Sequence, residues 1–296
     1  MLEGERAPMF LVRYSDAAGP RIGIALDRGV LPTDHRDLGA LISAGPSELE
    51  LLRSAVEEAD ASGLLRDPQL LAPLPHSAQL LFAGANYRSH LAETGLEPKE
   101  PLFFAKLRSS VVGPGSPIVI PSPETQTDWE AELAVVIGQT AHRIRAEDAM
   151  GYVFGYTLVN DVSARDVMSR DRMQITLSKS PDTFGPLGPH IVTADSIPDP
   201  TTTPLELTTK VNGVLKQQAV TTDMIFAIPE LLEFLSRTMT LQPGDIVSTG
   251  TAGGTGMGRT PQEFLRPGDE VTVSVTELGE LTNPVLAGWD ADRSDA

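Results

Sequence analysis

The sequence predicts a mixed α/β, β-rich protein with two parts: a small α+β N-terminal domain over residues 1–75 and a larger β-rich domain over residues 76–296. Two observations support this division. Short apolar runs separated by Gly, Pro, Asn and Asp dominate the second part, as is typical of strands joined by turns. The proline-rich segment Leu71–Pro75 is typical of a linker. The whole chain of 296 residues is long enough to bury a sizeable core.

The N-terminal part combines strands with a helix. Residues 9–14 and 22–26 are strand-like, and a Gly-Pro pair at 19–20 marks the turn between them. A helix is expected next, because Ser47 and Glu50 have the spacing of a capping box. Its apolar face continues at helical spacing through Leu49, Leu52 and Val56.

Beyond residue 76 most of the signals indicate strands. Asn212-Gly213 predicts a tight hairpin turn, and two Pro-Gly-Asp triplets, at 243–245 and 267–269, predict turns that lead into further strands. One helix is expected over 228–238, since Pro229 suits its first turn. The strands expected around these turns cover residues 205–211, 214–220, 246–249 and 270–275.

Composition narrows the function. A net charge of -17 argues against nucleic acid as a partner, because phosphate contacts need clustered Lys and Arg. The chain has no cysteine, so disulfides, thiolate metal sites and a cysteine nucleophile are excluded. Neither a signal pattern nor an apolar run of about 18 residues is found, so we expect a soluble cytoplasmic protein with no membrane partner.

Three carboxylates are the leading candidates for chemistry. Glu130 and Glu132 lie in a strand-like run over 127–138, which places them on one face with Cα atoms roughly 6.6 Å apart. Asp161 ends a second strand-like run. Like charges held together against an apolar run raise the pKa of one carboxylate or demand a cation, and oxygen ligands favour a hard divalent ion. The alternative is an ordinary half-exposed strand whose acidic face is solvated.

Two further groups lie in suggestive surroundings. In a short helix over 87–93, His90 and Glu93 face the same way, so the carboxylate can make the imidazole a better general base. Lys179 lies among turn-forming residues, where it can neutralise a substrate carboxylate or an enolate. The alternatives are a surface histidine beside a helix-stabilising glutamate and a merely solvated lysine.

A glycine-rich loop over 250–258 follows the strand at 246–249. It lacks the Gly-Lys-Ser/Thr ending of a phosphate-binding loop, so its backbone N–H groups are better suited to hold a carboxylate. The chain also contains no Gly-x-Ser-x-Gly nucleophile elbow, which disfavours a serine hydrolase.

Taken in order, these motifs resemble the fumarylacetoacetate hydrolase family. The resemblance extends from residue 84 to about residue 258, and the number and order of the blocks are more specific than any one of them. The matching blocks are Asn-Tyr-x-x-His-x-x-Glu at 86–93, Phe-x-Lys at 104–106, Asp-x-Glu-x-Glu-Leu-Ala-Val-Val-Ile-Gly at 128–138, Asn-Asp-Val-Ser-Ala-Arg-Asp at 160–166, Lys-Ser-x-Asp-Thr-Phe-x-Pro-Leu-Gly-Pro at 179–189 and the Gly-Thr-rich loop.

The resemblance implies a distorted β-roll for the C-terminal domain, and a homodimer. It implies Mg²⁺ or Mn²⁺ on Glu130, Glu132 and Asp161, with water or the oxygens of a 2-oxo acid completing the shell. His90 and Glu93 would carry the general base on a lid helix. The residues expected to hold the substrate or its enolate are Lys179, Arg165, Tyr87, Thr251 and Gly250.

Some positions depart from the family pattern. Met168 stands where many relatives have Gln, Pro181 replaces a usual Phe, and Ala252 replaces a usual Pro. These changes leave the expected metal ligands intact and bear on the substrate.

We expect hydrolytic C–C cleavage of an acylpyruvate-type 1,3-diketo acid through a metal-stabilised enolate. The alternative is an isomerase, decarboxylase or hydratase acting on a 2-oxo acid, which the Met168 substitution favours. A third hypothesis is a noncatalytic metal-dependent binding protein. It is disfavoured because binding alone needs no base.

Overall fold

The computed structural model describes residues 8–95, 98–169, 173–197 and 199–288. Its main layer is an eleven-stranded sheet, in which β4 (Leu70–Leu71) pairs with β1 and β7 (Val111–Val112) pairs with β13. The other nine strands, in spatial order, are β3 (Gly29–Pro32), β2 (Gly19–Leu26), β1 (Phe10–Asp16), β13 (Gly185–Thr193), β11 (Val153–Asn160), β10 (Ala131–Ile137), β16 (Ile246–Thr251), β5 (Leu80–Gly84) and β6 (Leu102–Ala105).

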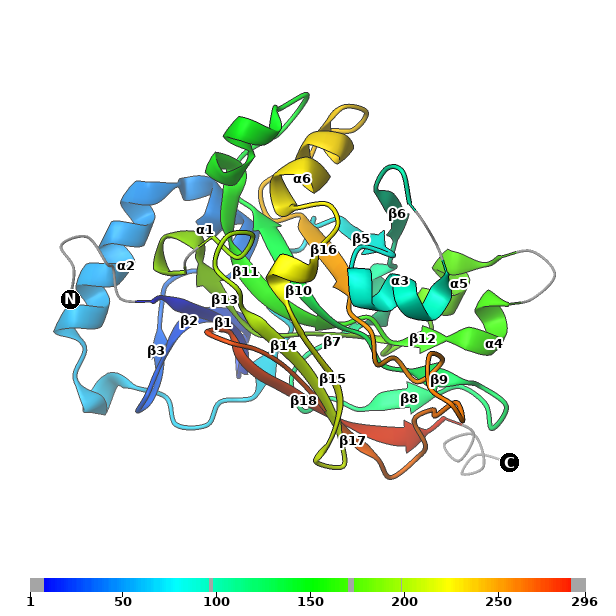
Figure 1. Cartoon of the computed structure of the whole chain (residues 1–296). Coiled ribbons are helices and arrows are strands. Elements are labelled where there is room, and N and C mark those ends of the chain that lie inside the picture. The colour runs from blue at the N-terminus through cyan, green and yellow to red at the C-terminus, as the bar shows by residue number, and fades with distance from the viewer. Residues whose placement is uncertain (1–7, 96–97, 170–172, 198, 289–296) are drawn as a thin grey trace.

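A second sheet of five strands packs against the first, and Figure 1 shows it below the large sheet. Leu133 and Val135 of β10 share one apolar cluster with Leu207 and Val273 of the second sheet. Ala134, on the opposite face of β10, belongs to another cluster. Since β10 is buried on both faces, its sequence is a continuous apolar run rather than an alternating one. The strands of the second sheet, in order, are β15 (Val214–Val220), β14 (Glu206–Val211), β17 (Glu270–Val275), β18 (Gly279–Ala287) and β8 (Ile118–Ile120).

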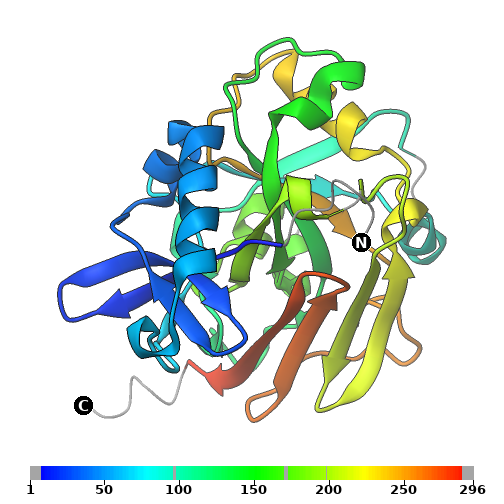
Figure 2. The same ribbon diagram turned by 90° about the vertical axis from the view of Figure 1, so that its left-hand side faces the viewer.

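Two helices cover the far face of the large sheet near the N-terminus, α1 (Leu38–Ala44) and α2 (Pro46–Glu58). Figure 2 shows them stacked beside the strands. Leu41 and Leu52 of these helices belong to the cluster that contains Ala134, so the N-terminal elements and the rest of the chain share a core. Strand β1 also pairs with β13. The domain boundary near residue 76 stays a prediction.

The predicted capping box at Ser47 is wrong. Helix α2 already begins at Pro46, one residue before Ser47. Its N-cap is Gly45, which makes no side-chain capping bond. Proline suits the first helical position because its ring fixes φ near the helical value. Its missing backbone N–H costs nothing there, since an N–H at that position has no partner within the helix. Ser47 therefore lies inside the first turn, where a capping side chain has no role.

The local turn signals are confirmed. Asn212 and Gly213 have φ angles of 51° and 76°, as the tight hairpin between β14 and β15 requires. Helix α6 (Ile228–Ser236) begins at the predicted residue and ends two residues earlier than predicted. Within the described parts of the chain, no helix is long and apolar enough to cross a membrane. The mixed, strand-rich fold class is thus confirmed.

Candidate active site

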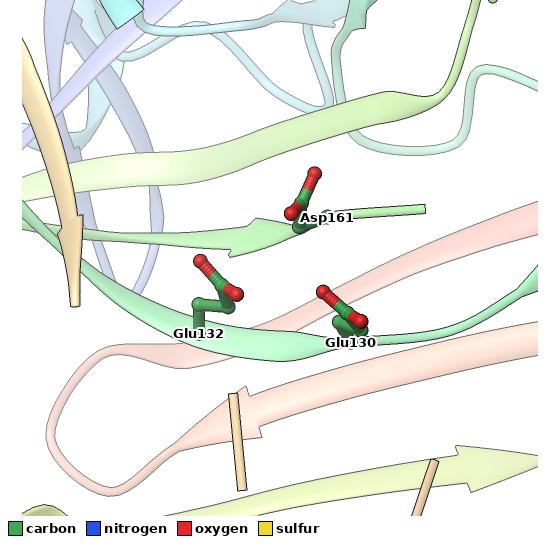
Figure 3. Close-up of side chains that lie close together, drawn as sticks. All are labelled: Glu130, Glu132 and Asp161. Atoms are coloured by element: carbon green, nitrogen blue, oxygen red, sulfur yellow. The ribbon is translucent and has the colours of Figure 1, made fainter. Parts of the chain in front are cut away.

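Strands β10 and β11 bring the three predicted carboxylates together. Glu130 directly precedes β10, Glu132 lies within it, and Asp161 directly follows β11. The two strands are antiparallel, and the backbone N–H of Asp161 donates to the carbonyl of Glu130 at 2.9 Å. One carboxylate oxygen from each residue lies within 4.8 Å of the others, and Figure 3 shows the three groups pointing toward one another. We call these three residues the carboxylate floor.

The floor is buried. The exposed fractions of Glu130, Glu132 and Asp161 are 4%, 1% and 0%. A solvated acidic strand face, the alternative that the sequence left open, is therefore wrong for these residues. Buried carboxylates must find a cation, because the protein interior solvates charge poorly.

Three basic side chains supply part of that positive charge. Lys179 donates to Glu130 Oε2 at 2.5 Å and to Asp161 Oδ2 at 2.6 Å. Arg165 donates to Glu130 Oε1, and Lys106 donates to Asp161 Oδ1 at 2.6 Å. Although burial alone would raise it, the attraction of Lys179 and Arg165 holds the pKa of Glu130 well below its usual range.

Within the described residues, no lysine or arginine donates to the carboxylate of Glu132, whose one hydrogen bond comes from the hydroxyl of Ser248. Burial and the repulsion of Asp161 and Glu130 raise the pKa of Glu132 well above its usual value. The site thus lacks positive charge at the one carboxylate that no lysine or arginine reaches. An oxygen-only, electron-rich cluster with this deficit fits a hard divalent cation.

Asp128 forms a second acidic layer beneath Arg165. Its Oδ2 accepts from Arg165 Nε at 2.8 Å, and its Oδ1 accepts from the backbone N–H of Gly256 at 2.6 Å. A Cβ on Gly256 would lie 1.9 Å from the carbonyl oxygen of Glu263, so the loop can approach Asp128 only with glycine there. The glycine-rich loop therefore does hold a carboxylate, but one that belongs to the protein itself.

Helix α3 (Arg88–Thr94) presents the predicted base. His90 Nδ1 lies 3.3 Å from Glu93 Oε2, and the backbone N–H of Gly254 donates to Glu93 Oε1 at 2.5 Å. Burial would raise the pKa of Glu93, but the hydrogen bonds from His90 and Gly254 lower it overall. Glu93 is thus held as an anion that orients the imidazole, as expected for a general base.

A cavity of about 270 Å³ opens above the floor. Its polar wall contains Glu130 and Glu132 together with His90, Arg165, Lys179 and Thr251, and its apolar wall contains Leu102, Phe104, Met168, Met173 and Ile175. Two of the predicted substrate-binding residues do not line it. Tyr87 is fully buried, with its hydroxyl 3.5 Å from Thr249 Oγ1, and Gly250 is a buried residue with φ of 90°.

Sequence reasoning assigned no role to three residues of this site, namely Lys106, Asp128 and Ser248. Each is buried and bonded to a floor residue or to Arg165. Lys106 and Asp128 fall inside the motif blocks at 104–106 and 128–138, so the signal that could have found them is a charged residue inside an apolar strand. Ser248 carries no such signal.

With this geometry in place, comparison with known proteins is informative. The model of the fumarylacetoacetate (FAA) hydrolase C-terminal domain matches residues 79–286. The chain belongs to the fumarylacetoacetate hydrolase family. It is a metal-dependent enzyme of that family, which sets aside the noncatalytic binding protein.

Three proteins of known structure or curated function are similar to this chain. The mitochondrial oxaloacetate tautomerase fahd2 of Xenopus laevis is 41% identical over 293 residues, covering 94% of this chain and 90% of its own. The fumarylacetoacetate hydrolase of Exiguobacterium antarcticum superposes with a TM-score of 0.81 at 33% identity, covering 94% and 99%. The maleylpyruvate hydrolase of Sphingobium sp. SYK-6, solved with manganese (II) and pyruvate, superposes with a TM-score of 0.76 at 31% identity, covering 95% and 100%.

Proposed function

We propose that this enzyme interconverts the keto and enol forms of a small 2-oxo dicarboxylic acid, with oxaloacetate as the substrate. The similarity to an oxaloacetate tautomerase over nearly the whole chain supports this activity. It supports the isomerase alternative better than the C–C hydrolysis that the sequence put first. The similarity to a hydrolase solved with pyruvate supports a 2-oxo acid as the shared substrate feature.

The structural observation that carries the proposal is the apolar wall beside the base. Met168 lines the cavity and lies 3.9 Å from Arg165 Nη1 through its sulfur. A thioether is a weak acceptor and cannot position a water molecule for attack. Hydrolysis needs such a water, whereas tautomerisation moves one proton from C3 to the oxygen on C2 and consumes nothing. The wall therefore favours the proton shift.

The protein's own groups can carry the proton in that shift. His90, oriented by Glu93, takes the proton from C3, and the same ring returns a proton to the enol oxygen. Lys179 and Arg165 line the cavity, where their positive charge can attract a carboxylate of the substrate. Mg²⁺ or Mn²⁺ held by Glu130, Glu132 and Asp161 would polarise the 2-oxo group and stabilise the enolate. A homodimer, as the family implies, is part of the same proposal.

The test is a substrate panel with Mg²⁺ or Mn²⁺ added. We expect the ultraviolet absorbance of enol-oxaloacetate to relax to its keto–enol equilibrium faster with enzyme, with oxaloacetate recovered intact by mass spectrometry. Pyruvate formed from oxaloacetate would indicate decarboxylation instead. If the enzyme cleaves acylpyruvates faster than it tautomerises any 2-oxo acid of the panel, hydrolysis is the better assignment.

A further inference from the structure

A second cavity, of about 310 Å³, lies where the N-terminal elements meet the rest of the chain. Arg13 of β1 and Arg36, just before α1, enter it from the N-terminal side. His76 and Arg108 enter it from the other side. Three guanidinium groups and an imidazole thus face one small space, in a chain whose net charge is -17. The overall composition makes such a gathering of positive charge unexpected.

The negative charge within this cavity is already engaged. Asp37 is the acidic residue that lines it. Its Oδ1 caps helix α1 by accepting from the backbone N–H of Ala40 at 2.9 Å, and its Oδ2 accepts from the backbone N–H of His76 at 3.4 Å. Neither carboxylate oxygen forms an ion pair with Arg13, Arg36 or Arg108 in the described parts of the chain. The arginines therefore keep most of their donors for another partner.

The arginines themselves are sparsely bonded. Arg13 donates to the carbonyl of Ala72 at 3.4 Å and Arg108 to that of Pro75 at 2.7 Å, while Arg36 donates no hydrogen bond to any residue that the structure describes. Burial and the nearby charge of Arg108 lower the pKa of Arg13, and the attraction of Asp37 offsets them only in part, so Arg13 and Arg108 repel each other across the cavity. An anion placed between them would relieve that repulsion.

We propose that this cavity, lined by Arg13, Arg36, His76 and Arg108, is a binding site for a compact divalent oxyanion, either phosphate or a small dicarboxylate. Guanidinium groups bind both through paired N–H···O bonds, which match the fork of a carboxylate or phosphate. The cavity volume leaves room for a compact anion together with bound water. Bound there, the anion joins β1 to the segment after β6, two residues from Lys106 of the active site.

The proposal is tested on the full chain in Mg²⁺ buffer by thermal melting and calorimetric titration. Inorganic phosphate and malonate are the two probes, with ionic strength held constant by sodium chloride. A ligand that binds only the folded state raises the melting midpoint saturably. A rise of the melting midpoint with phosphate, with malonate or with both supports the site, provided that the variants below weaken that rise. The probe that is effective shows whether the site takes phosphate, a dicarboxylate or either.

Arg13→Gln and Arg108→Gln should each weaken the affinity of the effective probe by about 10- to 100-fold, the scale of one charge-assisted hydrogen-bonded pair. Arg36→Gln is the safest variant, because it removes charge without removing a hydrogen bond to a described residue. Arg28→Gln is the matched control: it removes the same charge from an exposed turn of the same unit, outside the cavity. The site is refuted if neither probe raises the melting midpoint saturably. It is also refuted if the Arg36 variant shows the same probe-induced rise as the Arg28 variant and the wild type.

Discussion

The floor of the active site and the mouth of its cavity are built in contrasting ways. The floor residue Glu132 lies on a central strand of the large sheet, Glu130 and Asp161 lie directly beside the ends of such strands, and all three are at most 4% exposed. The cavity mouth, which we define as Leu102, Met168 and Met173, lies on the edge strand β6 and around two short helices, α4 (Arg165–Met168) and α5 (Ile175–Lys179). Leu102 is 46% exposed and Met173 is 74% exposed.

This contrast separates two tasks. Helices of four and five residues have no stability of their own, so the mouth depends on its packing and tolerates substitution. Replacing Glu130 or Asp161 would instead leave a buried lysine or arginine without its partner. The proteins similar to this chain include a tautomerase and a hydrolase, and we expect the choice between such reactions to depend on the mouth rather than on the floor.

The largest expected effect comes from breaking the floor. Glu132→Gln keeps an oxygen for the Ser248 hydroxyl but removes the charge that the divalent ion needs. We expect the metal to be lost and turnover to fall by at least about 10³-fold, since metal assistance supplies several kcal/mol. Metal content after gel filtration, together with the tautomerase assay, measures both.

Stability separates this outcome from misfolding. In the metal-free protein Glu132 is a buried carboxylate beside two others, so replacing it by a neutral amide should leave the melting temperature equal or higher. An active variant that retains its full metal content would show that Glu132 is not a ligand. A variant that melts lower without metal would mean that the carboxylate has a structural role.

The second prediction tests whether His90 acts in the reaction without binding the metal. His90→Gln should lower turnover by about 10²- to 10⁴-fold while metal content stays unchanged, because His90 lies on α3, outside the three carboxylates, and its Nδ1 is paired with Glu93. Glu93→Gln should have a smaller effect, since it removes only the anion that orients the ring. Metal loss in the His90 variant would instead place the imidazole among the ligands.

Sequence reasoning succeeded where the determining interactions are local. The Asn212-Gly213 turn follows from the backbone preferences of two residues, and the Glu130–Glu132 pair follows from the two-residue period of a strand. The Ser47 capping box was wrong because a competing local signal, Pro46, took the helix start. The correct predictions thus came from local sequence rules at positions where no adjacent residue favoured a different structure.

Two partners of the floor, Lys106 and Ser248, were not predicted, because they are distant in sequence from the carboxylates that they contact. Lys106 is 55 residues from Asp161, and Ser248 is 116 residues from Glu132. No periodicity or turn rule relates positions so far apart; only the order of strands in the sheet brings them together. The same holds for the glycine-rich loop, whose carboxylate partners proved to be Glu93 and Asp128.

The smallest expected effect sharpens the contrast most, because it changes the mouth and leaves the floor untouched. Met168→Gln places an amide within reach of Arg165 Nη1 and beside the cavity. The amide can hold a water molecule that the thioether cannot, and a net hydrogen bond of about 1 kcal/mol corresponds to roughly a fivefold change in rate. We expect the ratio of acylpyruvate hydrolysis to oxaloacetate tautomerisation to rise by about that factor, with metal content unchanged.

Leu177→Ser is the matched control for this substitution. Leu177 is 61% exposed on the adjacent helix α5 and does not line the cavity, so its replacement should alter stability by less than about 0.5 kcal/mol and leave the reaction ratio as it is. Both rates are measured on one preparation of each variant, which cancels differences in active fraction. If the two variants give the same ratio as the wild type, Met168 does not select the reaction, and selection must lie with the base on α3 or with the floor itself.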